Sequence, residues 1–214
     1  MIQVQNKQIE RELLDALVQK YITSRERSGI HVSHLIYCLT KSYYELTDPL
    51  PPTDNEVMLF SLGFGLENLL LREESHSVTG ELDGIKYSPD FVPLSSGKAE
   101  LKTTRMSTGK AFPETWLEQI MAYSYAEKLL QYDLVVLHIT GNYKPPFPQI
   151  AGYRLTFEQI ELDNNWANLL KRKMVLVVAL ESKTPPPHGV WCKDWECKFC
   201  RYYMRCGIGK VSND

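Results

Sequence analysis

The chain has 214 residues, of which 43% are hydrophobic and 23% charged, and its formal net charge is -2. This composition is ordinary for a globular protein with a buried core, and the length favours a single domain over residues 1–214. The net charge excludes a protein that is basic over its whole surface and coats nucleic acid, although a local basic groove is compatible with it.

The sequence predicts neither a membrane span nor a secretory signal. The longest apolar run, Met174–Leu180, is far shorter than the roughly 18 residues that a spanning helix needs. The first residues, MIQVQNKQIERELL, lack the apolar core of a signal peptide. We therefore expect a cytoplasmic protein with no membrane partner.

Apolar residues at helical spacing predict a mostly helical N-terminal part over residues 1–54. One amphipathic helix is expected from Asn6 to Arg27. A second is expected to begin at the N-cap Ser33 and to continue until Asp48, with Cys38 inside it.

The following segment, residues 55–184, is expected to be a core that mixes helices and strands. Thr53 and Glu56 have the spacing of a capping box for its first helix, in which Gly63 and Gly65 indicate close approach of another backbone. Asp83-Gly84 is typical of a turn between two strands. Strands are expected at 75–82, 85–92, 132–140 and 150–155, and helices at 55–74, 114–130 and 157–182, the last of them capped by Thr156.

The segment PDFVPLSSGKAELK, residues 89–102, combines two acids and a lysine and is predicted to be a β-hairpin. Side chains alternate along a strand, so Glu100 and Lys102 share one face while Leu101 points to the other. If Asp90 points the same way across the hairpin, two carboxylates and an ammonium converge. Such oxygen ligands suit Mg²⁺ or Mn²⁺. A charged strand face toward water is the simpler alternative.

Two further acids compete for or extend this set. Asp83 is an alternative to Asp90, but it is already explained as a turn residue, whereas Asp90 lies in an expected strand, where Asp is unfavourable without a reason. Glu67 lies in a mostly apolar helix, and it either reaches the surface or supplies a third carboxylate to the metal.

The helix after the hairpin carries two polar side chains on one face. Gln119 and Tyr123 are four residues apart, the spacing at which helical side chains are neighbours. They are expected either to bind a phosphate, to order the lysine, or to lie at the surface.

The tail, residues 185–210, follows a break at Pro185–Pro187 and contains four of the chain's five cysteines. Cys197 and Cys200 form a C-x-x-C pair and Cys206 follows it, which indicates a soft metal centre rather than disulfides in a reducing compartment. A fourth ligand is available from Cys192, giving a zinc knuckle, or from Cys38, which would join the two ends of the domain. Zinc and an iron-sulfur cluster both fit this spacing.

Together these motifs resemble the RecB-like nucleases of the PD-(D/E)xK superfamily. Within them, the similarity is to the iron-sulfur branch that includes the CRISPR-associated adaptation nuclease and the nuclease modules of AddB and of eukaryotic flap-processing helicase-nucleases. The matching residues come in the family's order and cover nearly the whole chain: Ser33 to Cys38 with Tyr43-Tyr44, Gly63 to Glu67, Pro89-Asp90, Glu100 to Thr103, Gln119 with Tyr123, and Cys197, Cys200 and Cys206.

The resemblance implies an α/β fold with a mixed central β-sheet flanked by helices, as in restriction endonucleases. It also implies a four-iron four-sulfur cluster that forms a lid between the N- and C-terminal segments. The implied cluster ligands are Cys38, Cys197, Cys200 and Cys206, which leaves Cys192 as a spare thiol.

By the same resemblance, Asp90, Glu100 and the Leu101 carbonyl would bind a divalent metal. Lys102 would position the attacking water and help to deprotonate it, and Gln119 and Tyr123 would hold the DNA strand. Many relatives have a histidine at the position of Glu67, so this acid is expected as a further metal ligand and leaves cleavage polarity and metal preference open.

The implied activity is that of a metal-dependent DNA exonuclease on single-stranded or frayed ends. The expected role is trimming during CRISPR spacer acquisition, an antiviral defence process, beside an integrase complex. A viral or mobile-element recombination or repair exonuclease is the alternative with the same chemistry. A non-catalytic module that binds DNA ends on the same fold is the alternative of a different class.

Overall fold

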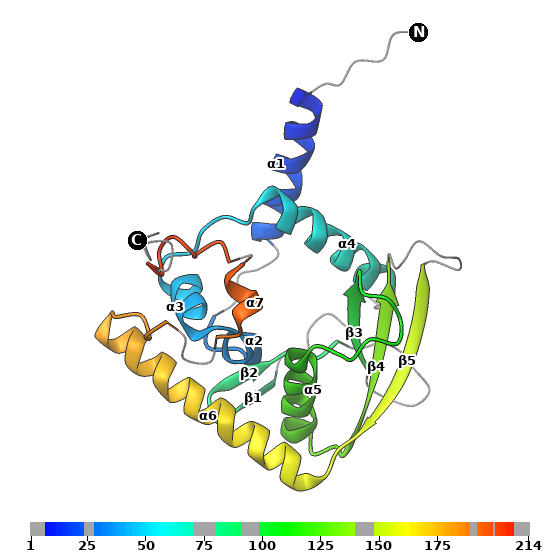
Figure 1. Ribbon diagram of the computed structural model, residues 1–214, viewed down its shortest axis with the longest axis vertical. Coiled ribbons are helices and arrows are strands. Elements are labelled where there is room, and N and C mark those ends of the chain that lie inside the picture. Colours follow the sequence, from blue (N-terminus) through cyan, green and yellow to red (C-terminus); the bar gives the residue numbers. More distant parts are fainter. Residues whose placement is uncertain are drawn as a thin grey trace, which may run out of the picture.

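The computed structural model describes residues 7–23, 28–70, 80–90, 99–139, 148–188, 192–198 and 200–207. This part of the chain confirms the predicted fold class, an α/β fold with a mixed sheet flanked by helices (Figure 1). Its elements, in chain order, are α1 Lys7–Thr23, α2 Val32–Ile36, α3 Leu39–Thr47, α4 Asp54–Leu70, β1 Gly80–Leu82, β2 Ile85–Tyr87, β3 Ala99–Thr104, α5 Glu114–Glu127, β4 Gln131–His138, β5 Gln149–Thr156, α6 Gln159–Ser182 and α7 Asp194–Cys197.

The described three-stranded sheet has the order β3-β4-β5 and mixed direction. Strand β3 pairs with β4 in parallel, and β4 pairs with β5 antiparallel. A parallel pair needs a crossover connection, and α5 supplies it between β3 and β4. The crossover places α5 against the sheet, which brings its side chains over β3.

A short hairpin of β1 and β2 forms a separate two-stranded sheet that contacts α2, and its turn is the one that the sequence predicts. Asp83 and Gly84 both have positive φ, of 50° and 68°, as a two-residue hairpin turn of this hand requires. The Asp83 carboxylate accepts a hydrogen bond of 2.9 Å from the Trp166 indole on α6. Asp83 therefore forms the turn and anchors it to α6.

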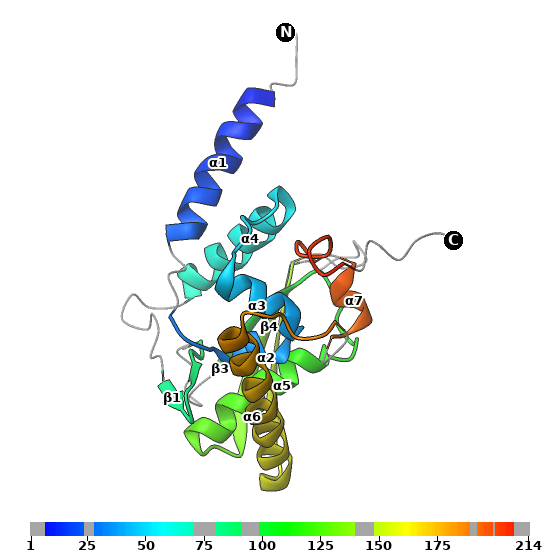
Figure 2. The ribbon, with the colours of Figure 1, turned by 90° about the vertical axis from the view of Figure 1, so that its left-hand side faces the viewer.

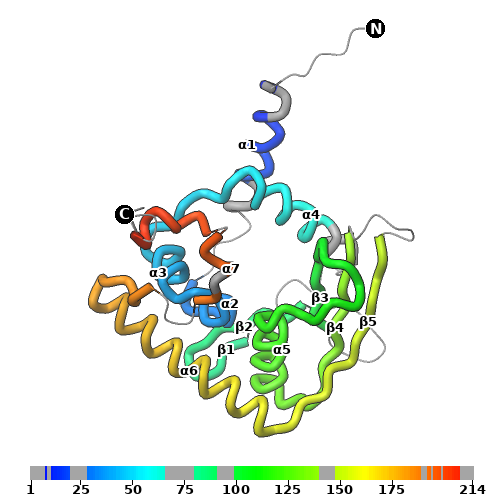
Figure 3. The backbone as a smooth tube through the Cα atoms, in the orientation of Figure 1, coloured from blue at the N-terminus to red at the C-terminus, as the bar shows by residue number. Residues whose placement is uncertain are grey.

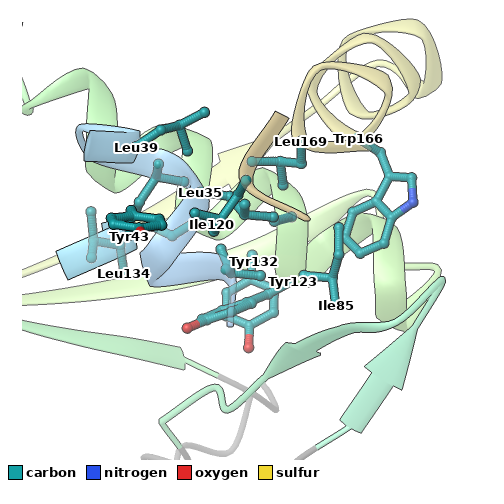
Figure 4. Close-up of a cluster of buried hydrophobic side chains, with 14 of the residues drawn as sticks. Leu35, Leu39, Tyr43, Ile85, Ile120, Tyr123, Tyr132, Leu134, Trp166 and Leu169 are labelled. Carbon is teal, nitrogen blue, oxygen red and sulfur yellow. The ribbon is translucent and has the colours of Figure 1, made fainter. Parts of the chain in front are cut away.

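The main hydrophobic core joins α2, α3, α5, α6 and the sheet (Figure 4). Trp166 is 2% exposed and stacks on Tyr125 with ring centroids 4.9 Å apart. Full burial of a large apolar side chain contributes roughly 1.5–3 kcal/mol, so this core is a major source of stability. A smaller cluster of Ala99, Leu101 and Leu137 lies on the opposite face of the sheet.

The helices surround this core unequally. Helix α6 runs along one flank, and α4 extends from the end of α3 toward the strand ends of the sheet (Figures 1 and 3). Helix α1 contacts α4 and projects away from the remainder of the molecule in both views (Figures 1 and 2). None of the helices in the described segments has the length and apolarity that a membrane span requires.

The predicted helix from Ser33 to Asp48 is wrong in one important respect, because it is interrupted at Tyr37 and Cys38. His31, rather than Ser33, is the N-cap of α2, and Cys38 is the N-cap of α3. At the break, one backbone carbonyl and one backbone amide form hydrogen bonds with distant side chains instead of helical hydrogen bonds. The Tyr37 carbonyl accepts from the Arg172 guanidinium at 2.8 Å, and the Cys38 amide donates to the Glu196 carboxylate at 2.8 Å.

Several local predictions are corrected in the core. Thr156 ends β5, and the N-cap of α6 is Glu158, whose amide donates to the Glu161 side chain at 2.8 Å. Asp90 lies beyond the end of β2 and not in a strand. The rest of the predicted hairpin, residues 91–98, lies outside the described residues, and β3 pairs with β4.

The helix-start prediction at Thr53 and the glycine prediction in α4 have opposite outcomes. The capping box is confirmed, since the Thr53 amide donates to Glu56 at 2.8 Å and the Glu56 amide donates to the Thr53 hydroxyl at 3.3 Å. The close backbone approach predicted at Gly63 and Gly65 is not found among the described residues, where a Cβ at either position would meet no atom within 4 Å. Gly63 instead borders an open cleft.

Candidate active site and cysteine pocket

The register of β3 determines which of its side chains face α5. Glu100 pairs with Leu134 of β4, and Lys102 pairs with Val136, both of which belong to the main core. Leu101 points the other way, into the smaller apolar cluster. Glu100 and Lys102 thus share the α5 face of the sheet, as strand alternation predicts.

The two predicted acids and the lysine form one hydrogen-bonded network. The Leu101 amide donates to Asp90 at 3.1 Å, and the Asp90 amide donates to Glu100 at 3.3 Å. Lys102 Nζ donates to Glu100 Oε1 at 2.7 Å. Glu100 is only 2% exposed, so this ion pair lies in a largely dehydrated site where the attraction is much stronger than at the surface.

Helix α5 continues the network through its predicted pair. Lys102 Nζ donates a second hydrogen bond, of 2.7 Å, to Gln119 Oε1. Gln119 Nε2 then donates to the Tyr123 hydroxyl at 2.7 Å, and that hydroxyl donates to the Ser88 carbonyl at 3.4 Å. The structure thereby brings together all five residues predicted along this segment, and it orders the lysine between two acceptors.

The charges in this network alter two proton affinities. Burial lowers the pKa of Lys102, but attraction to Glu100 and the hydrogen bond to it outweigh burial, so the pKa is raised overall. Burial is the main reason that the pKa of Tyr123 lies well above its usual value, with Glu100 adding to the effect. Lys102 is therefore an ammonium and Tyr123 a neutral phenol at physiological pH.

A cleft of about 550 Å³ opens beside this network, between α4 and β3. Asp90 and Lys102 reach its wall, whereas Glu100 is buried behind them. The other lining residues are mainly aromatic and apolar, with one arginine: Tyr37, Leu59, Phe60, Leu62, Gly63, Phe64, Leu101, Thr103, Thr104, Arg105, Trp116 and Ile139.

The donor set at the cleft fits a hard divalent cation. Asp90 and Glu100 offer carboxylate oxygens, and the two residues are joined by the hydrogen bond from the Asp90 amide to the Glu100 carboxylate. The Asp90 carboxylate in turn accepts from the amide of Leu101, whose carbonyl is a further oxygen of β3. Such oxygen ligands are the ones that Mg²⁺ and Mn²⁺ prefer. The side chain of Glu67 lies outside the described residues, and Asp83 is not among those that line this cleft.

A second, smaller pocket gathers all five cysteines of the chain. Cys38 comes from the α2–α3 break, and the other four come from the tail. The lining residues are Cys38, Lys41, His188, Cys192, Glu196, Cys197, Cys200, Tyr203 and Cys206. The predicted convergence of Cys38 with Cys197, Cys200 and Cys206 is therefore present in the fold, and Cys192 joins them.

The tail is fixed in place by polar contacts with α3 and the residues after it. The Leu50 amide donates to the Tyr202 hydroxyl at 3.1 Å, and Arg201 donates to the Leu50 carbonyl at 3.1 Å. Tyr202 stacks on Tyr44 with ring centroids 5.7 Å apart. These contacts fasten the tail to α3 and the residues that follow it.

Three of the thiols in this pocket, those of Cys192, Cys200 and Cys206, have raised pKa values. Burial raises the pKa of Cys206 to about 11, and the neighbouring cysteines add to the effect. Burial also raises the pKa of Cys192 and Cys200. A cation that converts several of these thiols to thiolates must therefore release protons on binding.

Sequence reasoning missed three residues that shape the two sites. His188 places its Nε2 3.4 Å from the Cys197 sulfur. Glu196 bonds the Cys38 amide, and Arg172 bonds the Tyr37 carbonyl. His188 had a local signal, since it lies four positions before Cys192. Arg172 and Glu196 had none, because their partners are far away in the sequence.

No family model and no curated protein sequence matches the chain. Among solved structures, that of SSO0001 is 19% identical to the chain, with coverage of 92% of this chain and 95% of that one and a TM-score of 0.58. This likeness shows a shared fold.

Two looser likenesses are to exonuclease structures. The structure of LHK-Exo in complex with dAMP, an alkaline exonuclease from Laribacter hongkongensis, has 10% identity, coverage of 72% and 91%, and a TM-score of 0.45. A phage-related exonuclease from Haemophilus somnus has 13% identity, coverage of 81% and 82%, and a TM-score of 0.34.

Proposed function

We propose that the chain is a divalent-metal-dependent DNA exonuclease whose centre is the network of Asp90, Glu100 and Lys102. The observation that supports the proposal is that Asp90 and Lys102 line an open cleft and are both hydrogen-bonded to the buried Glu100. A buried concentration of charge that reaches a cleft is typical of an active site rather than of a scaffold.

Asp90, Glu100 and the Leu101 carbonyl would hold Mg²⁺ or Mn²⁺, with Glu67 as a further ligand. Bound there, the ion would supply positive charge to the scissile phosphate and lower the pKa of a coordinated water. The side chains do the positioning. Lys102, fixed by Glu100 and Gln119, directs its ammonium at the attacking water and at the negative charge that develops on the phosphate.

Gln119 and Tyr123 have a positioning role in this proposal. Gln119 accepts a hydrogen bond from Lys102, and Tyr123 is 4% exposed and holds the Gln119 amide. This geometry favours the alternative in which the pair orders the lysine over the one in which it holds the DNA strand. The latter stays a prediction that a complex with DNA would test.

The lining of the cleft favours single-stranded or frayed DNA. Tyr37, Phe60 and Trp116 offer aromatic faces, on which exposed bases stack with roughly 1–3 kcal/mol each. Arg105 lies in the same wall and suits a backbone phosphate. Bases are available for such stacking only where the duplex is open.

A four-iron four-sulfur cluster on Cys38, Cys197, Cys200 and Cys206 completes the proposal, with zinc as the alternative. Thiolates are the ligands of both, and the pocket supplies them from both ends of the domain. The broader role that fits the resemblance is trimming of spacer precursors beside a CRISPR integrase. Recombination or repair by a virus or mobile element uses the same chemistry.

The test is cleavage of end-labelled single-stranded and duplex oligonucleotides by the purified full chain with Mg²⁺ or Mn²⁺. Glu100→Ala and Lys102→Ala should abolish degradation, and Glu81→Ala, an exposed acid on β1, serves as the matched control. Full activity in both site variants would refute the proposal. No cleavage by the unaltered chain, together with no Mg²⁺ or Mn²⁺ binding by calorimetry, would favour the non-catalytic DNA-end binding module.

A further inference from the structure

The group of His188, Cys192 and Cys197 has a geometry of its own within the cysteine pocket. One ligand atom from each residue lies within 4.8 Å of the other two. The Cys192 and Cys197 sulfurs are 3.5 Å apart, and His188 Nε2 is 3.4 Å from the Cys197 sulfur. The four-cysteine set proposed for the cluster contains neither His188 nor Cys192.

These separations match those between ligands that share one tetrahedral ion. Zinc-ligand bonds of roughly 2.3 Å to sulfur and 2.0–2.1 Å to nitrogen place two sulfurs about 3.8 Å apart and a sulfur and nitrogen about 3.6 Å apart. In a four-iron cluster each thiolate binds a different iron, which holds the sulfurs farther apart. The contacts of Cys197 with Cys192 and His188 therefore favour a single ion.

The fourth ligand of the site would be Cys38, which lines the same pocket. Cys38 is not among the three residues whose ligand atoms already lie within 4.8 Å of one another, so its thiol would have to approach the ion. Three thiolates and one neutral imidazole around Zn²⁺ carry one net negative charge. Lys41 lines the pocket as well and can balance that charge.

We infer that the pocket contains a tetrahedral Zn²⁺ site formed by Cys38, His188, Cys192 and Cys197, overlapping the proposed cluster site. Cys38 and Cys197 belong to both sets, so zinc and the cluster exclude each other. His188 and Cys192 serve zinc alone, and Cys200 and Cys206 serve the cluster alone. The contrast with the cluster rests on the proposed function, but the zinc site itself does not.

The first experiment titrates Co²⁺, which reports tetrahedral coordination by its visible absorption, into the reduced, chelator-treated full chain under anaerobic conditions. The intense ligand-field bands of a tetrahedral cobalt-thiolate site are expected, and Zn²⁺ should displace them. Weak bands typical of octahedral cobalt in the unaltered chain would overturn the inference.

The variants form two matched pairs. Cys192→Ser and His188→Gln should weaken Co²⁺ binding by about tenfold or more, since each removes a ligand. Cys200→Ser and Cys206→Ser should leave the Co²⁺ affinity unchanged within about twofold. Equal weakening by both pairs would overturn the inference. The exposed His188 provides a variant that keeps the fold, as circular dichroism would verify.

A reconstitution experiment tests whether zinc and the iron-sulfur cluster exclude each other. After incubation with iron and sulfide, bound iron should be lost in Cys200→Ser and Cys206→Ser and retained in Cys192→Ser and His188→Gln. Protein preloaded with Zn²⁺ should take up a cluster only as zinc is released. Uptake of a full cluster with zinc retained would contradict overlapping sites. None of these measurements depends on DNA cleavage, so failure of the nuclease proposal remains distinguishable.

Discussion

The acid-lysine network takes its members from residues 88–123, whereas the cysteine pocket joins Cys38 to a tail segment that begins at His188. In the first, strand alternation and one helical turn place Glu100, Lys102, Gln119 and Tyr123 opposite their partners, and backbone amides add Asp90. In the second, no local periodicity brings the ligands together, and the convergence depends on the packing of α2, α3 and the tail. A site built on regular elements is fixed once those elements form, while a site built between distant segments depends on the stability of the whole fold.

The largest expected effect is at the regular site. Lys102→Ala should lower the rate of DNA cleavage by about 10²–10⁴-fold, the range for loss of a group that assists proton transfer or stabilises charge. Glu100→Ala should be at least as severe because it also removes one of the proposed metal ligands. Steady-state assays with Glu81→Ala as control measure this, and unchanged thermal unfolding would show that the fold persists. An activity loss that follows unfolding would show that Lys102 and Glu100 act on the fold rather than on cleavage.

Replacing Cys38 should affect the cysteine pocket rather than the acid-lysine network. Protein purified without oxygen should be brown, and Cys38→Ser should lose that colour and its bound iron, because the cluster loses the ligand from the other end of the domain. Iron analysis and visible absorption measure the effect. A colourless unaltered protein with stoichiometric zinc would show that zinc is the resident metal.

A smaller effect is expected from Gln119, which touches the network only through Lys102 and Tyr123. Gln119→Ala should reduce cleavage by roughly 10–100-fold, as for other residues that orient a functional group from behind. The reduction should appear in kcat, with little change in DNA affinity measured by anisotropy. A change confined to affinity would favour the DNA-holding role.

The smallest effect is expected at the contact that closes the cysteine pocket. Glu196 is 7% exposed and accepts from the Cys38 amide, so Glu196→Ala leaves a buried donor unsatisfied. The free energy of unfolding should fall by about 1–3 kcal/mol in urea titrations of metal-free protein. Glu196→Gln retains an acceptor and should recover part of the loss. Equal stability of all three proteins would show that water satisfies the amide.

The regular site was largely predictable because its spacings are short. The E-x-K on β3 and the Gln119–Tyr123 pair follow from the two- and four-residue periods, and the structure brings them together. The position of Asp90 outside a strand was not predictable. Asp90 is linked to β3 by two hydrogen bonds, from the Leu101 amide to its carboxylate and from its own amide to Glu100, rather than by sheet pairing. The role of each residue and the division at residues 54 and 185 remain predictions.

The cysteine site was predictable in its residue types but not in its detail. Spacing identified the C-x-x-C pair and left two choices for the fourth ligand, and the fold brings both Cys38 and Cys192 to the pocket. The break in the helix at Tyr37 had no sequence signal, because the apolar periodicity continues through it. Arg172 and Glu196 bond the freed backbone groups, and such long-range contacts cannot be predicted from a local pattern.

That break makes the two sites immediate neighbours. Tyr37 lines the cleft beside Lys102, and the next residue, Cys38, lines the cysteine pocket. Adjacent Cα atoms are separated by about 3.8 Å across one rigid peptide plane. In the proposed function, a metal ligated by Cys38 and a DNA base stacked on Tyr37 would therefore contact two residues that share one rigid peptide plane.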